Sequence, residues 1–329
     1  MSQTLAPAPD SLAAMLPELR GRIARNAPLG AQTWFRVGGP AELLVRPEDA
    51  EDLAAFLGKL PPELPVTTIG AASNLIIRDG GLAGIVIRLS RGFGSVSVEA
   101  DGIVAGSACL DMTIAEHAAE AGLQGLEFLA GIPGSIGGAV AMNAGAYGSE
   151  MTDVLDWAEI VTRAGDLMRL PVQALGFGYR RSSLPDGAVV VRARLRASAG
   201  DPALIALRMA EIRAAREATQ PTRARTGGST FRNPAASETD RKAWELIDMA
   251  GCRGLTLGGA QVSEKHCNFL LNTGNATAAD LEALGDTVRA RVLAASGISL
   301  AWEIKRIGIP IQMPELHVAE SNASGERSA

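Results

Sequence analysis

Gly70-Ala-Ala-Ser-Asn-Leu-Ile-Ile-Arg-Asp-Gly-Gly81 is the most informative stretch of this chain, together with Gly131-Ile-Pro-Gly-Ser-Ile-Gly-Gly138 further on. Both consist largely of small residues, so their backbone N–H groups can converge on an anion without a side chain in the way. A helix that starts behind such a loop adds the positive end of its dipole. The two stretches together predict a cradle for the phosphates of a nucleotide-type ligand.

Composition and length restrict the class of protein. The chain has 329 residues, enough for two or three domains and for an enclosed ligand. Its hydrophobic content of 47% is typical of soluble globular proteins, and a net charge of −5 leaves no basic footprint for nucleic acid. No apolar run approaches the roughly 20 residues that cross a bilayer, and the first ten residues do not resemble a signal peptide. We therefore expect a cytoplasmic protein that binds neither nucleic acid nor membranes.

Metal and disulfide chemistry are not indicated. Cys109, Cys252 and Cys267 form no Cys-x-x-Cys pair, and three histidines in the whole chain show no ligand spacing. His117 lies in a helical pattern with acidic neighbours and is assigned no role. The sequence predicts no metal site.

Hydrophobic periodicity and end signals give a mixed pattern of helices and strands. Asp101-Gly102 marks a hairpin tip, Asp201-Pro202 opens a helix, and Thr277 with Asp280 forms a helix cap. Helices are predicted over 46–58, 112–121, 201–220, 240–250 and 277–296. Strands are predicted over 66–70, 84–89, 95–99, 103–106, 157–162, 189–196, 268–272 and 300–307. A domain boundary is predicted at Pro221, and the remainder makes a second domain of about ninety residues.

The small-residue loops match neither standard nucleotide motif. Gly-x-Gly-x-x-Gly after a strand and Gly-x-x-x-x-Gly-Lys-Ser/Thr are both missing from the sequence. A single such stretch is also compatible with a surface hairpin loop. A third small-residue segment, Asn143-Ala-Gly-Ala-Tyr-Gly148, favours an extended diphosphate ligand but names no reaction.

Nine landmarks in a fixed order carry a resemblance that covers nearly the whole chain. They are Asn26-x-Pro28-Leu29, Thr33 to Ala41, the Gly70 loop, Ala130 to Ala139, Asn143 to Tyr147, Phe177-Gly-Tyr-Arg180, Gly228-Ser-Thr-Phe-Arg-Asn-Pro234, Val262-Ser-Glu-Lys-His266 and Glu303-Ile-Lys-Arg-Ile-Gly308. In these residues the chain resembles the UDP-N-acetylenolpyruvoylglucosamine reductases, flavoenzymes of peptidoglycan synthesis.

The resemblance implies an α+β fold with two parts. A two-lobed FAD-binding domain of the vanillyl-alcohol-oxidase (PCMH) type is expected over 17–220, with lobes at about 17–90 and 91–220. A smaller C-terminal α/β substrate-binding domain is expected over 221–313, with flexible tails at 1–16 and 314–329. The implied cofactors are FAD, and NADPH as co-substrate. FAD is expected to bind non-covalently, because neither glycine-rich loop holds a histidine or cysteine for covalent attachment.

The implied reaction is the reduction of UDP-N-acetyl-enolpyruvoylglucosamine to UDP-N-acetylmuramate, a step of cell-wall precursor synthesis. Arg180 would hold the substrate carboxylate by paired N–H donors. Glu303 would act beside it on the developing enolate, and Ser229 would donate the proton to the substrate carbon. Without the resemblance, other roles fit the same residues. Arg180 could be a solvated surface arginine, and Glu303 could lie on the solvent-exposed face of a strand. Gly227-Gly-Ser-Thr230 could be a flexible linker.

The resemblance also carries over the remaining site residues. The substrate contacts that it implies are Tyr179, Asn233, Lys265 and His266, in addition to Arg180, with Lys265 the partner for the UDP diphosphate. Predicted cofactor contacts are Gly70, Ala71, Ala72, Ser73, Asn74, Gly131, Ile132, Pro133, Gly134, Ser135, Gly137, Gly138, Asn143 and Gly145.

Two positions depart from the family pattern. Ala72 stands where glycine is more usual, and Arg232 replaces a common lysine. The chain has no tyrosine after Tyr179, so it is similar to the branch of the family that lacks a tyrosine lid over the substrate.

Two other readings remain open. An oxidase of small alcohols or sugars with the same fold would share the N-terminal loops, but it would not need Ser229 paired with Glu303. A non-catalytic nucleotide-sugar-binding protein could keep the loops without either residue. The small-molecule substrate and NADPH are the only partners that the sequence implies.

Overall fold

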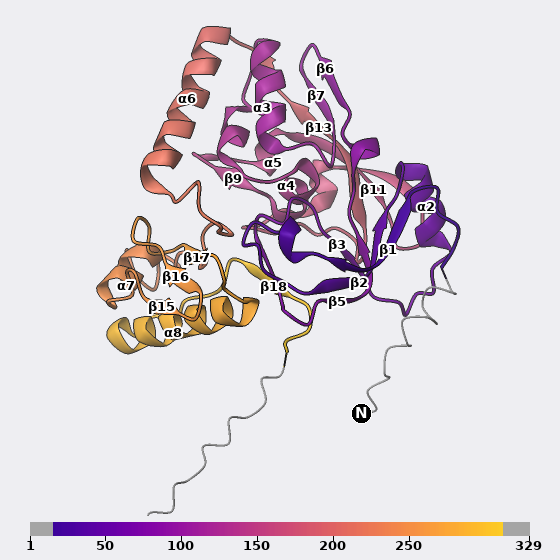
Figure 1. Cartoon of the computed structure of the whole chain (residues 1–329). Helices are drawn as coiled ribbons and strands as arrows, with labels where there is room; N and C mark the ends of the chain where they lie inside the picture. The colour runs from indigo at the N-terminus through magenta and orange to yellow at the C-terminus, as the bar shows by residue number, and fades with distance from the viewer. Residues whose placement is uncertain (1–15, 312–329) are drawn as a thin grey trace, which may run out of the picture.

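The computed structural model describes residues 16–311, which form three packed units (Figure 1). The first is a four-stranded sheet. Its strands, in sheet order, are β1 (Arg22–Pro28), β2 (Pro40–Arg46), β5 (Leu82–Ile87) and β3 (Val66–Thr68). β1 runs antiparallel to β2, and the other two pairs are parallel. Helix α2 (Ala50–Gly58) covers the sheet with the fully buried Leu53 and Phe56.

The second unit is a five-stranded antiparallel sheet. Its strands, in sheet order, are β12 (Leu167–Pro171), β11 (Leu155–Val161), β13 (Val189–Arg196), β7 (Gly102–Gly106) and β6 (Val96–Glu99). Helices α3 (Asp111–Glu120), α4 (Ile136–Met142) and α6 (Pro202–Thr219) pack on one face and close the largest hydrophobic core. Val161, Val189 and Val191 belong instead to the core of the first unit, so the two sheets share apolar packing.

The third unit follows α6 and lies at the lower left of Figure 1, below the second unit and beside the first. It contains the small antiparallel sheet β15 (Thr256–Leu257), β16 (Ala260–Val262) and β17 (Leu270–Asn272), with helices α7 (Ala243–Met249) and α8 (Ala278–Ser296). Its core also includes Phe35, Val37 and Ile76 from the first unit. The third unit is therefore packed onto the first through apolar side chains.

Short elements connect these units. They are η1 (Gly30–Gln32), β4 (Leu75–Ile77), η2 (Arg91–Phe93), β8 (Leu123–Gln124), η3 (Glu127–Gly131), β9 (Gly145–Ala146), β10 (Ser149–Glu150), α5 (Met151–Val154), η4 (Val172–Leu175), β14 (Ser198–Ala199) and β18 (Lys305–Ile307).

The end of the chain returns to the first unit. β18 pairs in parallel with β4, so the stretch expected as a strand over 300–307 forms one only at its end and joins a different unit from the one expected. The expected domain boundaries stay a prediction, and the expected tails lie outside the described residues, apart from residue 16.

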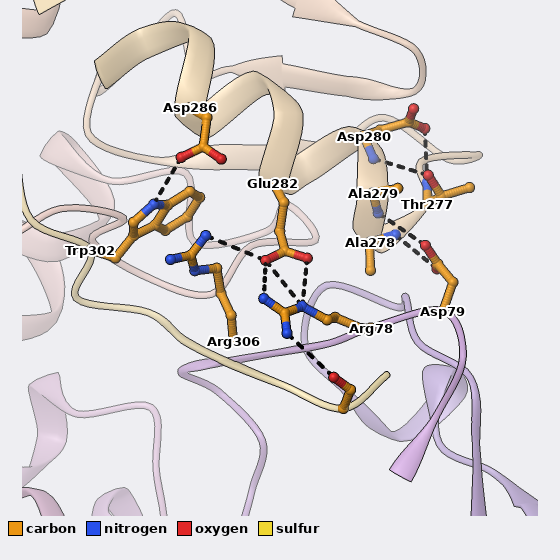
Figure 2. A network of polar contacts seen from close by, with 11 residues as sticks. Arg78, Asp79, Thr277, Ala278, Ala279, Asp280, Glu282, Asp286, Trp302 and Arg306 are labelled. Atoms are coloured by element: carbon orange, nitrogen blue, oxygen red, sulfur yellow. Dashed lines mark hydrogen bonds and ion pairs between the residues drawn. The ribbon is translucent and has the colours of Figure 1, made fainter. Parts of the chain in front are cut away.

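Polar contacts strengthen this junction (Figure 2). Glu282 on α8 accepts hydrogen bonds from Arg78, with Nε to Oε2 at 3.0 Å, and from Arg306 at 3.4 Å. The carboxylate of Asp79 accepts the N–H groups of Ala278 and Ala279, each at 2.9 Å, at the first turn of α8. The loop after β4 therefore caps a helix of the third unit and pairs with its side chains.

Candidate active site

A cavity of about 390 Å³ is lined by residues of all three units. Its size lies within the range of small-molecule and cofactor sites. Twelve of the fourteen predicted cofactor contacts line it: Gly70, Ala71, Ala72, Ser73, Asn74, Gly131, Ile132, Pro133, Gly134, Ser135, Gly138 and Gly145. Gly137 and Asn143 are not among the residues that line it.

The first small-residue loop leaves β3 and meets the second loop directly. A Cβ on Gly70 would lie 2.9 Å from Ser135 Oγ, so a side chain at residue 70 would displace the Ser135 hydroxyl. Ala72 adopts φ +52°, a left-handed conformation that favours glycine and explains why glycine is more usual here. Alanine is accommodated, at a cost in backbone strain.

The second loop is held against the segment between β7 and α3. The N–H groups of Gly137 and Ile136 donate to the carbonyl groups of Ser107 and Cys109 at 2.9 and 3.0 Å, and that of Asp111 donates to Gly134 at 3.2 Å. These bonds fix the backbone that turns toward the cavity. The loop is therefore a preformed cradle.

Two buried polar side chains at the cavity have no partner within the described chain. The carboxyl oxygens of Asp111 and the hydroxyl of Thr226 make no hydrogen bond, although both residues line the cavity. Buried polar groups are normally paired, so a polar ligand is the natural partner. Together with the glycine cradle, these groups fit a bound dinucleotide.

Arg180 and Glu303 form an ion pair at the cavity wall. Arg180 Nε lies 3.1 Å from Glu303 Oε1, and the side chains are 25% and 13% exposed. Arg180 Nη2 donates to the Gly145 carbonyl at 3.0 Å, and the residue has φ +53°. The guanidinium is thus held in one orientation by groups distant in sequence.

Ser229 lies on the same wall as Glu303. The segments that carry them run antiparallel: Glu303 N–H donates to the Thr230 carbonyl at 2.8 Å, and Arg232 N–H donates to the Ala301 carbonyl at 2.9 Å. Ser229, Arg180 and Glu303 all line the cavity. The structure therefore brings together the three predicted catalytic side chains.

Comparison with known proteins decides the family. The model of the UDP-N-acetylenolpyruvoylglucosamine reductase C-terminal domain matches residues 220–307, and that of an FAD-binding domain matches residues 41–171. The chain is 67% identical to the UDP-N-acetylenolpyruvoylglucosamine reductase of Acidiphilium cryptum over 297 residues, which are 90% of this chain and 95% of that protein.

The chain belongs to the UDP-N-acetylenolpyruvoylglucosamine reductase family.

Two further relatives of the reductase family are similar over most of their length. The reductase of Gluconobacter oxydans is 63% identical over 290 residues, 88% of this chain and 94% of that protein. The crystal structure of the Thermus caldophilus reductase has a TM-score of 0.76 at 36% identity and covers 88% of this chain and 100% of its own. These matches confirm the expected family, the α+β fold with an FAD-binding and a C-terminal domain, and the assignment as an FAD-dependent oxidoreductase.

The four other predicted substrate contacts do not line the cavity. Lys265 donates to the Glu217 carbonyl, Asn233 Oδ1 accepts from Ala243 N–H at 3.0 Å, and Tyr179 lies 56% exposed beside Arg180. The His266 ring packs on Phe269, which lines the cavity, with centroids 4.8 Å apart. Their role as substrate contacts stays a prediction.

The sequence reasoning missed several residues of the cavity. Arg216 and Gln220 at the end of α6 line it, with Arg216 Nε 3.4 Å from Gln220 Oε1, and so do Asp111 and Thr226. Asp111 occupies the first position of α3, where an acid is ordinary for a helix start, so its pattern gave no functional signal. Burial of its side chain is visible only in the fold.

Residues 16–311 contain no group of three or more metal-ligating side chains. In the same range, no helix is both long and apolar enough to cross a membrane.

Proposed function

We propose that this chain reduces UDP-N-acetyl-enolpyruvoylglucosamine to UDP-N-acetylmuramate with NADPH and FAD, and that Arg180, Glu303 and Ser229 carry out the substrate half of the reaction. One observation supports the roles above all: the three side chains share a cavity wall with the two glycine-rich loops. The FAD, when bound, supplies hydride transfer from NADPH to the alkene carbon of the substrate. The two loops would hold its diphosphate. None of the described residues that line the cavity is a histidine or cysteine, which supports non-covalent binding.

Arg180 binds the carboxylate of the substrate. Glu303, Gly145 and Asn143 engage its Nε, one N–H of Nη2 and one N–H of Nη1, so each terminal nitrogen keeps one further N–H. A guanidinium is permanently charged and matches a carboxylate by paired donors. Its fixed charge therefore stabilises the negative charge that develops next to the carboxylate.

Glu303 holds Arg180 in place, so that the guanidinium faces the negative charge of the enolate as it forms. Its side chain is largely withdrawn from water, so its interactions are weakly screened. Its backbone is fixed by the Thr230 carbonyl and its own carbonyl faces Asn74 Nδ2 at 3.5 Å, which ties it to the first glycine loop. Glu303 thus links the substrate side of the cavity to the cofactor side.

Ser229 donates a proton to the substrate carbon. A serine hydroxyl is a weak acid, and only a strongly basic carbanionic carbon would take its proton. Gly228 before it adopts φ +80°, a turn that places Ser229 at the cavity lining. Cationic Arg180 on the same cavity lining is positioned to lower the energy of the alkoxide left behind.

The test separates the two half-reactions. We expect Ser229→Ala to leave flavin reduction by NADPH within about twofold of wild type and to slow flavin reoxidation by the enolpyruvyl UDP-sugar by roughly 100-fold or more. Ser97→Ala, at an exposed serine of β6, is the matched control. Equal slowing of both half-reactions would contradict the proton-donor role.

The same assay distinguishes the two other readings. An oxidase would reoxidise its flavin with oxygen without the UDP-sugar, and a non-catalytic protein would not bleach with NADPH. Because the proposed substrate and NADPH are small cytoplasmic metabolites, we propose that the enzyme works in the cytoplasm without a nucleic-acid, membrane or protein partner.

A further inference from the structure

We propose that Asp111 binds the cofactor as a neutral carboxylic acid, with its O–H donating a hydrogen bond to a phosphate oxygen of FAD. The proposal rests on FAD occupying this cavity. It is independent of the roles proposed for Arg180, Glu303 and Ser229, and its failure would leave those roles unchanged.

The position of Asp111 supports the proposal. Its carboxyl group lies directly against the second glycine loop, since a Cβ on Gly134 would come within 2.6 Å of Asp111 Oδ2. Its N–H donates to the Gly134 carbonyl at 3.2 Å, and the neighbouring Leu110 forms a bridge with Ser135. Asp111 is thus built into the backbone of the phosphate cradle.

The lack of a protein partner points to a ligand. Asp111 is fully buried, yet neither carboxyl oxygen has a hydrogen-bond partner within the described chain. An ionised carboxylate in this place would be unpaired and would also repel a phosphate. A protonated carboxyl avoids both costs, and it needs an acceptor of the kind that a phosphate oxygen provides.

The surrounding charges do not change this argument. Burial alone raises the pKa of Asp111 to about 8. On α3, which begins with Asp111, Glu116 lies 3.9 Å from Arg213 of α6, and His117 lies 4.0 Å from Glu120. From the preceding loop, Cys109 donates to the Ser95 carbonyl, and burial raises its pKa. The charged side chains elsewhere on the cavity lining are Arg180, Arg216, Glu303 and Lys305.

The sign of the pH dependence follows. Below about pH 8 the carboxyl already holds its proton, and FAD binds without proton uptake. Above that pH the free protein must take up a proton to bind. The dissociation constant of FAD should therefore rise by roughly tenfold per pH unit above the pKa.

FAD release from the holoprotein tests this without any activity measurement. Flavin fluorescence recovered on dilution gives the dissociation constant between pH 6 and 9.5. We expect a constant value up to about pH 8 in wild type and a steep rise above it. Asp111→Asn keeps an N–H donor but cannot titrate, so it should stay within a few-fold of wild type at pH 7 and remain flat to pH 9. Asp111→Ala should bind roughly tenfold more weakly at all pH values.

Asp186→Asn, at an exposed aspartate, is the matched control and should follow wild type. A pH-independent wild type, or Asp111→Asn as weak as Asp111→Ala, would overturn the proposal, because the carboxylate would then act as an acceptor. Unchanged FAD binding by Asp111→Ala would overturn it too. If Asp111→Ala does not fold, the pH profile of Asp111→Asn alone decides.

ADP tests the assignment to phosphate. It carries the diphosphate without the flavin ring, and its affinity, measured by competition with FAD, should weaken over the same pH range. A pH-independent ADP affinity beside a pH-dependent FAD affinity would overturn the assignment to a phosphate oxygen.

Discussion

Three residues with positive φ gather around the cavity. Ala72, Asn143 and Arg180 adopt φ values of +52°, +42° and +53°, a conformation that costs alanine or arginine roughly 1–2 kcal/mol and asparagine less. Such conformations persist where the surroundings hold them, and they concentrate at functional sites. Here each one turns the backbone at the cofactor loop or at the guanidinium. The strain is therefore part of how the site is preorganised.

The orientation of Arg180 matters as much as its charge. We expect Arg180→Lys to slow flavin reoxidation by the UDP-sugar by roughly 10- to 100-fold, because an ammonium cannot pair with a carboxylate while also reaching Glu303 and Gly145. Flavin reduction by NADPH should change little. Arg181→Lys, at the exposed next residue, is the control. A fully active Arg180→Lys would exclude a paired grip on the substrate.

The buried carboxyl of Asp111 makes the stability of the FAD-free protein depend on pH. Its pKa is about 8 in the folded chain against 3.8 as a reference for the unfolded chain, so between these values the folded state holds a proton that the unfolded state has lost. Stability is therefore lost as pH rises from about 4 to 8, by about 1.4 kcal/mol per unit at the steepest.

In Asp111→Asn this loss should disappear. Thermal unfolding of the FAD-free full-length chain, measured from pH 5 to pH 8, should show the advantage of the variant over wild type growing with pH. A constant difference between the two would mean that Asp111 keeps an ordinary pKa.

At the level of elements, the end of α4 organises the site from behind. Asn143 caps α4, its Nδ2 donates to the Gly178 carbonyl at 3.2 Å, and its Oδ1 accepts the Thr152 N–H at 2.9 Å. Its carbonyl faces Arg180 Nη1 at 3.5 Å. One buried side chain thus joins α4, α5 and the loop that carries Arg180.

Removing this side chain should loosen all three segments. We expect Asn143→Ala to lower the free energy of unfolding by roughly 1–3 kcal/mol, since a buried side chain loses two hydrogen bonds while the Gly178 carbonyl still accepts the Arg181 N–H. Asn275→Ala, at an exposed asparagine, should cost less than about 0.5 kcal/mol. Denaturant unfolding measures both. A loss no greater than that of the control would show that the partners find other hydrogen bonds.

Local signals explain which elements were predictable. Helices α6 and α8 agree with prediction to within a residue or two at each end because Asp201 and Thr277 cap them with their own side chains. Helix α2 begins later than predicted, at Ala50, since Asp49 and not residue 46 supplies the cap. β18 differs because a strand depends on its partner, and its partner β4 lies more than 200 residues earlier. No window of sequence contains that information.

At the scale of the whole molecule, the site too depends on contacts that no local window of sequence contains. Arg180, Ser229 and Glu303 come from three separate segments, and periodicity alone left each as an ordinary surface residue. Only the resemblance grouped them. Neither periodicity nor the resemblance singled out Asp111 and Arg216, because what distinguishes them is their place on a cavity that forms when three units pack together.

The junction in Figure 2 holds the third unit, and with it Ser229 and Glu303, against the cofactor loops. Glu282 is 16% exposed and is bound by Arg78 and Arg306, so Glu282→Gln would leave two guanidinium groups side by side without their anion. We expect a loss of roughly 1–2 kcal/mol in stability and slower flavin reoxidation by the UDP-sugar.

FAD release should be unchanged in Glu282→Gln, because its partners Arg78 and Arg306 are not among the predicted cofactor contacts. Fluorescence on dilution and stopped-flow reoxidation separate the two effects, and Glu63→Gln, at an exposed carboxylate, is the control. If FAD release increased as much as the rate of flavin reoxidation fell, the junction would support the cofactor cradle itself. If it lost neither, packing of Phe35 and Ile76 into the third unit would suffice to hold the catalytic wall in place.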